Sequence, residues 1–447
     1  MIALEVLLTL LRELVRAASV PLRIVAYLPF RHRWRRAALE VLDAAAHEHP
    51  QPAEDALQAF FARRRPNRGA RAHVFVSAGE ASGEAHAAAL VRALPRDVRV
   101  TAFGGHQLAE AGADLRFALS EHAVMGVLSV LRQLPLILRA FVDYLRLLRD
   151  DPPDLVVLVD YPGLHVVMAK SARRRKIPVL HYVAPQYWAW GPWRMRRYRR
   201  AVDATLTILP FETAFFRRFR VPATYIGHPL LDDIARHPAD PRAVAEVRSK
   251  RTLVLLPGSR SAEIISNLPG MLRVALALRA TDPSLRVVLP HKDPRRGDLV
   301  RELLRANTAE FVEYVPGALT PWLLGARLIL AKSGTGSLEA CLSGNPTIVV
   351  YRLRGLLSTL GYHNILSVPW IAAANLIAGR RVVPEHCFHG DHGWYDVQAD
   401  AERLWNDEAA RKEVAAGLAE VRQRLGAPGA TGRVAAVVNR FLLGVPS

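Results

Sequence analysis

The sequence predicts an α/β protein with two doubly wound, Rossmann-like domains and an N-terminal helical extension. Two observations support this fold class. From residue 72 onward, short apolar runs alternate with helical stretches, and Gly, Pro or Ser follows many of those runs. Strands that alternate with helices indicate parallel sheets with right-handed crossovers. The apolar runs also form two sets, separated by a polar stretch at residues 232–250.

The first set predicts a domain over residues 71–245. It begins with "HVFVSA", followed by a Gly/Ser loop and a helix, and continues with the runs "RVTAF", "PDLVVLVD", "IPVLHYVAP", "ATLTILP" and "PATYIG". The second set predicts a domain over residues 246–447, with the runs "RTLVLLPG", "SLRVVLP", "EFVEYVPG", "ARLILAK" and "NPTIVVYR". In such sheets ligands bind at the carboxyl ends of the strands.

Composition limits the classes of function. Hydrophobic residues make up 51% of the 447 residues, which is enough for large cores and argues against global disorder. The net charge of +19 favours an anionic partner, namely nucleic acid, anionic lipid or a phosphorylated substrate. The charge is spread along the chain and no recognition module is visible, so no nucleic-acid partner is expected. Two cysteines without a CxxC pair indicate neither a disulfide framework nor a metal site.

Residues 1–70 form the predicted extension. Its first helix is amphipathic, with a narrow polar face made by Glu5, Thr9, Arg12, Glu13 and Arg16. These charges interrupt the apolar run, so we expect neither a membrane-spanning helix nor a signal peptide. Two interpretations remain open: an anchor lying in the interface of an anionic membrane, or a helical hairpin packed on the main body.

Two strand ends of the second domain suggest a phosphate site. Residues 331–344, "AKSGTGSLEACLSG", follow a strand and open a helix, so the small residues Ser333, Gly334 and Thr335 would let backbone amides approach a phosphate. Glu339 lies one turn later, where it could accept hydrogen bonds from ribose hydroxyls. The pattern completes neither GxGxxG nor a Walker motif, and a simple strand–turn–helix junction is the alternative. In "LLPGSR", Ser259 and Arg260 also follow a strand, and Arg suits a diphosphate.

The first domain offers a candidate base and candidate sugar-binding groups. Asp160 ends the apolar strand of "LVVLVDYPG" and could act as a general base, although a helix cap is the commoner role for such a residue. Glu80 and Ser82, in "SAGEASGE", could bind sugar hydroxyls or a phosphate. Residues 181–200, "HYVAPQYWAWGPWRMRRYRR", combine aromatics with arginines such as Arg194, a combination that can bind nucleic acid, a membrane surface or a phosphorylated sugar.

Taken together, these motifs resemble those of the lipid-A-disaccharide synthase family. The similar segments run from about residue 73 to 385, in the order "AGEASGE", "AVMG", Asp160–Pro162, "HYVAPQYWAW", "LPFE", "IGHPL", "LLPGSR", "KSGTGSLE" and "NLIAGR". The resemblance implies a GT-B fold, in which the two domains face each other across a cleft. It also implies an inverting, metal-independent transfer of diacylglucosamine from UDP-2,3-diacylglucosamine to 2,3-diacylglucosamine 1-phosphate (lipid X), with no cofactor.

The resemblance assigns roles to the candidate residues. The first domain would bind the acceptor through Glu80, Ser82 and Arg194, with Asp160 as base. The second would bind the UDP-sugar, with Arg260 also catalytic, through the residues Ser259, Arg260, Ser333, Gly334, Thr335, Glu339 and Asn375. The family further implies a peripheral protein on the cytoplasmic face of the inner membrane and a homodimer.

Several positions depart from the family pattern. Leu164 and His165 stand where the family has Phe and Asn, Ser129 stands where it has Glu, and Ala372 to Ala374 replace Ser-x-Pro. An insertion, residues 191–193, separates "WAW" from Arg194. These changes leave two other hypotheses open: a GT-B transferase or epimerase acting on another UDP-sugar, and a non-catalytic GT-B binding protein.

Overall fold

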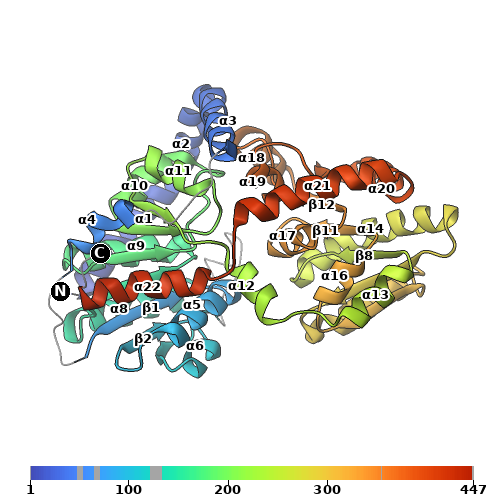
Figure 1. Ribbon diagram of the computed structural model, residues 1–447. Helices are drawn as coiled ribbons and strands as arrows, with labels where there is room; N and C mark the ends of the chain where they lie inside the picture. The colour runs from blue at the N-terminus through green and yellow to red at the C-terminus, as the bar shows by residue number, and fades with distance from the viewer. Residues whose placement is uncertain (1, 48–53, 65–70, 121–132, 354, 445–447) are drawn as a thin grey trace. The chain divides into compact units, whose positions relative to one another are not determined.

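A computed structural model describes residues 2–47, 54–64, 71–120, 133–353 and 355–444 of the chain. The chain forms two compact units (Figure 1). Unit 1 comprises residues 1–41, 49–232 and 427–447, and unit 2 comprises residues 42–48 and 233–426. Each unit contains one parallel sheet covered by helices, which confirms the predicted fold class.

The sheet of unit 1 has seven parallel strands in the order β3-β2-β1-β4-β5-β6-β7. In the central strands every residue of β1 and β4 is buried, as expected for strands covered on both faces. Val74 of β1 pairs with Val100 of β2 and with Leu155 of β4. The strands are β1 (His73–Ala78), β2 (Arg99–Phe103), β3 (Asp114–Phe117), β4 (Leu155–Val159), β5 (Val179–Tyr182), β6 (Ala204–Thr207) and β7 (Ala223–Tyr225).

Helices connect and cover these strands. Among them are α5 (Ala81–Ala93), α6 (His106–Glu110), α8 (Leu134–Asp150), α9 (Pro162–Arg174), α10 (Met195–Arg199), α11 (Glu212–Arg218) and α12 (Pro229–Arg236). The C-terminal helix α22 (Ala430–Leu443) also belongs to unit 1 and lies beside α5 (Figure 1). Asp232 fixes its beginning, because the carboxylate accepts hydrogen bonds from the amides of Ala430 (3.1 Å) and Thr431 (2.8 Å).

The sheet of unit 2 has six parallel strands in the order β10-β9-β8-β11-β12-β13. They are β8 (Thr252–Leu256), β9 (Arg286–His291), β10 (Val312–Pro316), β11 (Leu328–Lys332), β12 (Thr347–Leu353) and β13 (Glu385–His389). The helices are α13 (Pro241–Ser249), α14 (Ser261–Thr281), α15 (Gly297–Ala306), α16 (Thr320–Gly325), α17 (Thr335–Leu342), α18 (Leu356–Ile365), α19 (Ala373–Ala378), α20 (Gly393–Asn406) and α21 (Glu408–Leu425).

The units differ from the expected domain ranges at three places. The end of α3 (Arg31–His47), from Leu42, clusters with unit 2 although it belongs to the expected extension. Helix α13 clusters with unit 2, where it packs on α16, so the division falls near residue 232 and not at 245. After α21 the chain returns to unit 1, so residues 427–447 lie outside the domain in which the sequence pattern placed them. None of these changes alters the strands that carry the candidate site residues.

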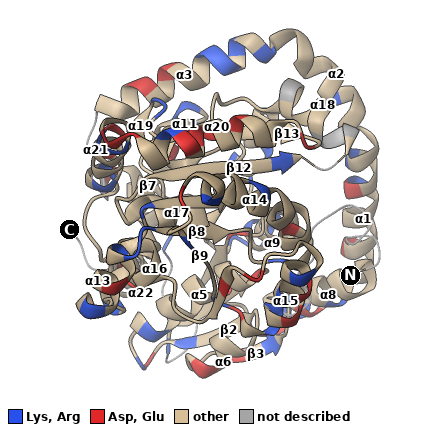
Figure 2. Ribbon diagram, turned by 90° about the vertical axis from the view of Figure 1, so that its right-hand side faces the viewer, with Lys and Arg blue, Asp and Glu red and all other residues tan. Residues whose placement is uncertain are grey.

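The extension contains the helices α1 (Ile2–Ala18), α2 (Val20–Tyr27), α3 (Arg31–His47) and α4 (Gln58–Phe61). Its final part is a true component of unit 1, because Leu57 and Phe60 are buried in the hydrophobic core and Phe60 stacks on Phe441 at 4.6 Å. Helices α1 and α3 carry both signs of charge along their length (Figure 2). Within the described residues, no helix has the length and apolar character needed to cross a membrane.

Candidate active site

The candidate residues follow the strands at which the order in each sheet reverses direction. In unit 1 these strands are β1, which precedes residues 79–80 and the start of α5, and β4, which precedes Asp160. In unit 2 they are β8 and β11, which precede residues 257–260 and 333–336. Such reversal points form the crevices in which doubly wound sheets bind ligands. Each unit therefore presents its candidate residues at the place expected for a ligand site.

Asp160 occupies a strained turn directly after β4. Asp160 and Tyr161 have φ angles of 54° and 46°, so two consecutive residues adopt the left-handed conformation. Each such residue costs of order 1–3 kcal/mol unless the surroundings hold it, and strain of this kind is concentrated at functional sites. Pro162 then begins α9 at a position suited to proline.

Two buried histidines hold this turn. His165 Nδ1 and His181 Nε2 lie 2.7 Å and 3.0 Å from the backbone carbonyl oxygen of Asp160. Because a carbonyl only accepts hydrogen bonds, both of these nitrogens carry the proton. The opposite ring nitrogens then accept from the hydroxyls of Ser77 and Tyr198, each at 2.9 Å.

Burial keeps both imidazoles neutral. It lowers the pKa of His165 to about 3 and that of His181 to about 4. His165 is one of the departures from the family pattern, and the structure shows what its side chain does. It donates to the Asp160 carbonyl, which the amide of an Asn could also do. Leu164, the neighbouring departure, is a buried packing residue.

The side chain of Asp160 has the protonation properties of a general base. Burial raises its pKa to about 6, and the negative charge of Glu80 adds to the rise. The amide of Tyr161 opposes the shift through a hydrogen bond. A carboxylate with this pKa is ionised at neutral pH and is more basic than an ordinary Asp.

The loop after β1 approaches Asp160 closely. A Cβ on Gly83 would lie 3.5 Å from the Asp160 Cβ, and one on Gly79 would collide with the Tyr161 ring. Glu80, which precedes α5, is half-buried, and Ser82 in the first turn of α5 is exposed. Glu84 of α5 is buried and holds the start of α6, accepting from the Gln107 amide at 2.9 Å. The structure thus brings Glu80, Ser82 and Asp160 together on unit 1.

The aromatic stretch after β5 packs within unit 1. Trp188 is buried and donates to the carboxylate of Glu212 at 3.2 Å, and burial raises the pKa of Glu212 to about 7. Arg194 is exposed, stacks over Tyr187 with its guanidinium carbon 4.5 Å from the ring centroid, and donates to the Trp190 carbonyl. These contacts tie Arg194 to Tyr187 and Trp190 of its own loop. None of them joins Arg194 to Asp160, Glu80 or Ser82.

The insertion before Arg194 is matched to the N-terminal extension. Trp193 packs on Tyr27 of α2 with ring centroids 4.8 Å apart, and Tyr27 is buried. Trp34 of α3 stacks on Phe219 at 5.8 Å. The insertion and the extension, both of which depart from the family pattern, therefore pack on each other through Trp193 and Tyr27.

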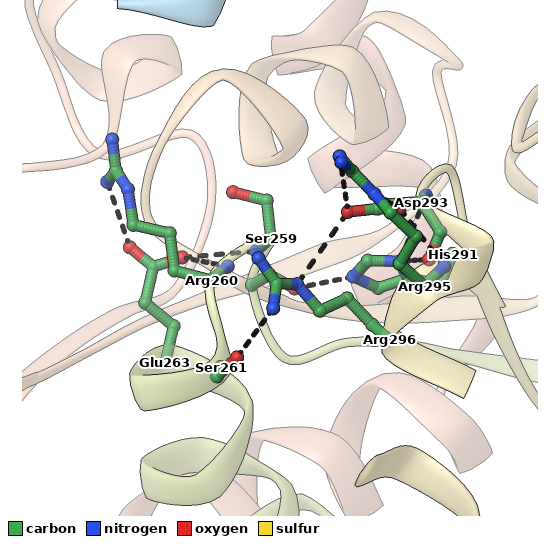
Figure 3. A network of polar contacts seen from close by, with 9 residues as sticks. Ser259, Arg260, Ser261, Glu263, His291, Asp293, Arg295 and Arg296 are labelled. Carbon is green, nitrogen blue, oxygen red and sulfur yellow. Dashed lines mark hydrogen bonds and ion pairs between the residues drawn. The ribbon is translucent and has the colours of Figure 1, made fainter. Parts of the chain in front are cut away.

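In unit 2, Glu263 organises the loop after β8 (Figure 3). One of its carboxylate oxygens accepts from the backbone amides of Ser259 (3.1 Å) and Arg260 (3.4 Å). The other lies 3.4 Å from the Arg260 guanidinium and 2.9 Å from Lys332 Nζ. Burial works to raise the pKa of Glu263, but the hydrogen bond and charge of Lys332 outweigh it, so the pKa is lowered and the carboxylate is ionised.

A second group of residues supports the same loop from β9. His291 Nε2 lies 3.2 Å from the Gly258 carbonyl, and its Nδ1 accepts from the Asp293 amide at 3.1 Å. Arg296 donates to the Ser261 hydroxyl at 2.8 Å, and Arg295 pairs with Asp293 (Figure 3). The Arg260 loop is thus held by Glu263 of α14 and by His291 of β9, and the Glu263 carboxylate contacts both Arg260 and Lys332.

The loop after β11 leaves open space above its backbone. Gly334 has a φ of 154°, a conformation that favours glycine. A Cβ on Gly336 would meet no atom within 4 Å, and one on Gly334 would meet only Lys332 Nζ at 3.7 Å. Ser333 is buried, whereas Gly334 and Thr335 are exposed at the N-terminus of α17. Backbone amides at a helix N-terminus beside Lys332 suit a phosphate group.

Glu339 and Lys292 form an ion pair that the sequence patterns did not indicate. Glu339 is buried within α17, and Lys292 Nζ lies 3.0 Å and 2.9 Å from its two carboxylate oxygens. Each oxygen has a second lone pair with which it can accept from a ligand hydroxyl. Lys292 and Lys332 are the two residues that sequence reasoning missed, although each lies at the carboxyl end of a strand in that sequence.

Asn375 requires a correction. The family resemblance implies that it contacts the UDP-sugar, but its side chain is fully buried and its amide is satisfied internally. Its oxygen accepts from the amides of Val382 (2.8 Å) and Val383 (3.0 Å), and its nitrogen donates to the Val383 carbonyl and to Glu385. Asn375 therefore positions the chain between α19 and β13.

Glu385 explains how the chain tolerates alanines before Asn375. Its carboxylate accepts from the amides of Ile371 (3.1 Å) and Ala372 (2.9 Å), which precede α19. Ala372 has no side-chain cap of its own, so Glu385 satisfies amides that a serine could otherwise serve. Ser129 and the "VMG" segment lie outside the described residues.

Comparison with known proteins supports the family resemblance that the motifs indicate. The sequence model of the family described as "Lipid-A-disaccharide synthetase" matches residues 74–427. The lipid-A-disaccharide synthase of Myxococcus xanthus is 37% identical over 379 residues, covering 83% of this chain and 97% of that protein. The enzyme of that name from Acidobacterium capsulatum is 36% identical over 397 residues, covering 83% and 96%.

Solved structures agree on the fold at low sequence identity. MurG of Acinetobacter baumannii superposes with a TM-score of 0.52 at 14% identity, covering 83% of this chain and 99% of that one. UDP-GlcNAc 2-epimerase of Neisseria meningitidis, bound to UDP-GlcNAc, gives a TM-score of 0.53 at 13% identity, covering 83% and 100%. These likenesses identify the two-domain GT-B architecture. From the sequence relationships, the chain belongs to the lipid-A-disaccharide synthase family.

Proposed function

We propose that this protein transfers diacylglucosamine from UDP-2,3-diacylglucosamine to the 6-hydroxyl of 2,3-diacylglucosamine 1-phosphate (lipid X). The products are the β-1,6-linked lipid A disaccharide 1-phosphate and UDP. The observation that carries the proposal is Asp160, a family motif residue held in a strained turn with a pKa raised to about 6. Its carboxylate removes the proton from the acceptor hydroxyl as that oxygen attacks the anomeric carbon.

Direct attack opposite the leaving group makes the reaction inverting. As the bond from the anomeric carbon to the diphosphate breaks, negative charge grows on UDP. We propose that Arg260, the 333–336 amides and the Thr335 hydroxyl stabilise that charge, and Lys332 lies beside this loop. These groups supply the positive charge that a metal-independent transfer requires. Glu339 accepts from the ribose hydroxyls while Lys292 holds it, and Ser259 and Ser333 complete the donor site.

Glu80, Ser82 and Arg194 are proposed to bind the acceptor. Glu80 and Ser82 lie at the start of α5, in the segment beside Asp160, where they suit sugar hydroxyls. The exposed Arg194 guanidinium suits the 1-phosphate. Asn375 is not proposed to contact the UDP-sugar directly, because its side chain has no exposed surface.

The test of this function is turnover by an Asp160→Asn variant. We expect UDP release to fall by about 100-fold to 10,000-fold, the range for loss of a general base, while UDP binding is retained. Asp154→Asn is the matched control, since Asp154 lies before the same strand and is bonded to the His73 amide. Turnover of the Asp160 variant equal to that of the control would remove Asp160 as the base.

We also propose a peripheral location on the cytoplasmic face of the inner membrane, where both lipid substrates would be met. The exposed leucines of α1 and α2 and the net charge of +19 support attachment to an anionic membrane. Deleting the extension would be a poor test, because Leu57 and Phe60 belong to the core of unit 1. Leu14→Ser combined with Leu22→Ser changes only exposed side chains and should reduce vesicle binding; unchanged binding would refute the attachment.

The family resemblance extends the proposal to a homodimer. Light scattering on the purified protein tests this directly, and a monomeric mass over the working concentration range would contradict it.

A further inference from the structure

Helix α1 packs with its charged side toward the rest of unit 1 and its apolar side toward solvent. Glu5 accepts from Arg175 at 2.7 Å, and Glu13 accepts from Arg197 at 2.6 Å. The opposite side of α1 and its continuation in α2 expose large hydrophobic side chains, a surface that we call the outward apolar face. It consists of Leu4, Leu7, Leu8, Leu11, Leu14, Val15, Leu22 and Val25, which are 41–73% exposed.

Helices that pack on a protein core usually bury their apolar side and expose their charges. The reverse arrangement here leaves a contiguous apolar surface with no part of the described chain covering it. Surfaces of this kind mark sites of interaction with a membrane or another protein. The charged residues next to the outward apolar face favour a membrane over a protein partner.

A cavity of about 300 Å³ lies between the inner side of α1 and helices α9 and α10. Its lining is strongly basic, and we call it the cationic cavity; the basic residues are Arg12, Arg16, Arg23, Lys170, Arg174, Arg197 and Arg200. Glu13 is the single acidic residue of the described lining, and it is already engaged by Arg197 and lies 4.0 Å from Arg16. Positive charge in the cavity therefore far exceeds the carboxylate that could balance it.

Four of these cations, Arg12, Arg23, Lys170 and Arg200, have no carboxylate within 4 Å in the described part of the chain. The imbalance affects protonation. Burial and then the charge of Arg197 lower the pKa of Lys170 to about 8, and the same two causes lower the pKa of Arg16. An anion in the cavity would relieve both shifts, and guanidinium groups are well suited to phosphate oxygens.

The cavity and the apolar face meet at Val15, which lines the cavity and is 71% exposed. A phosphate bound among the cations therefore has apolar surface directly beside it. This combination fits an amphiphile with a phosphate head and hydrocarbon chains. At about 300 Å³ the cavity is at the small end of ligand pockets, so it would take the headgroup alone.

We propose that the cationic cavity binds the phosphate headgroup of an anionic phospholipid while the outward apolar face lies against the acyl chains of the same membrane. The extension would then be a headgroup-selective anchor and not merely an apolar helix. This inference rests on the membrane attachment proposed above and is independent of the transfer reaction. The cavity residues have no role in the proposed chemistry.

The experiment measures binding of the full-length protein to vesicles of phosphatidylcholine with and without phosphatidylglycerol. The cavity variant is Arg12→Gln/Lys170→Gln/Arg200→Gln, and the control is Arg92→Gln/Arg96→Gln/Arg305→Gln, which loses the same charge from exposed positions elsewhere. With about tenfold in affinity expected for each 1.4 kcal/mol and about 1 kcal/mol for each basic residue at a membrane, the cavity variant should lose roughly 100-fold on anionic vesicles. The control should lose less than about threefold.

Each outcome has a defined meaning. Equal losses in the cavity and control variants would overturn the proposal, and so would full displacement from anionic vesicles by inorganic phosphate, which would indicate a free-phosphate site. Failure of the unaltered protein to bind any vesicle would refute the membrane attachment itself. UDP release measured in detergent should be unchanged in the cavity variant, which shows that the variant is folded and separates this inference from the proposed reaction.

Discussion

Replacing Glu80 by glutamine is expected to move the pH profile of the enzyme toward lower pH. Asp160 must be ionised to accept a proton, and its pKa is raised to about 6 by burial and by the charge of Glu80. In the unaltered enzyme kcat/KM should therefore fall as pH drops below about 6, reaching about one tenth of its plateau at pH 5. Removing the Glu80 charge removes one cause of the raised pKa, so the acidic limb moves down.

The assay is UDP release measured over a pH series for the unaltered enzyme, Glu80→Gln and the control Glu110→Gln. Glu110 is exposed on α6, so its loss should leave the profile in place. Glu80 is also proposed to touch the acceptor, so the plateau can fall in its variant; the position of the limb is the informative quantity. An acidic limb that stays in place in Glu80→Gln, or a flat profile in the unaltered enzyme, would refute the assignment of Asp160.

Three other predictions concern single positions. Arg260→Ala should reduce kcat by about 100-fold to 1,000-fold, as expected when a donor to developing charge is lost, and an unchanged kcat would exclude that role. His165→Leu should lower the free energy of unfolding of the protein, measured in urea, by about 1–3 kcal/mol because the Ser77 hydroxyl and the Asp160 carbonyl lose a buried partner; His165→Asn should retain most of it. Asn375→Ala should destabilise unit 2 by a similar amount without changing UDP affinity in the folded protein, and a selective loss of UDP binding would contradict its placement in the core.

The fold was largely predictable because its central strands are continuous apolar runs. β1, β4 and β8 are buried along their whole length, and β11 is buried up to Lys332. The residues that follow these strands are Gly79, Asp160, Pro257 and Ser333, so both the strands and their functional ends are visible in the sequence. The outer strands β3 and β13, "DLRF" and "EHCFH", are short or polar and carry no such signal. Pairing with a neighbour creates them, and a single sequence does not show that pairing.

The candidate site was predictable where a residue stands at a strand end, and less so where contacts decide its role. Asp160 and the 333–336 loop needed only their position after a strand. Lys292 and Lys332 acquire their meaning from Glu339 and Glu263, which lie 47 and 69 residues away. Asn375 occurs in a family motif, yet only the structure shows that its side-chain amide is fully hydrogen-bonded to the backbone of Val382 and Val383 and to Glu385.

The extension shows a limit of helical periodicity. The narrow polar face of α1 was visible in the sequence, and an amphipathic pattern fits both a packed hairpin and a membrane anchor. The structure shows that α1 packs on the rest of unit 1 through Glu5 and Glu13 while its leucines face outward, and membrane attachment stays a proposal. The partners of those glutamates, Arg175 and Arg197, are distant in sequence, so the orientation of the helix could not be derived from its pattern.

Mass spectrometry of the products formed when the purified protein is given UDP-2,3-diacylglucosamine and lipid X decides whether this chain performs the proposed transfer. We expect UDP and a disaccharide 1-phosphate that joins the two diacylglucosamine units through a β-1,6 bond, with Asp160→Asn forming almost none. Recovery of unchanged lipid X, or a product in which another sugar has been transferred or epimerised, would contradict the proposed reaction.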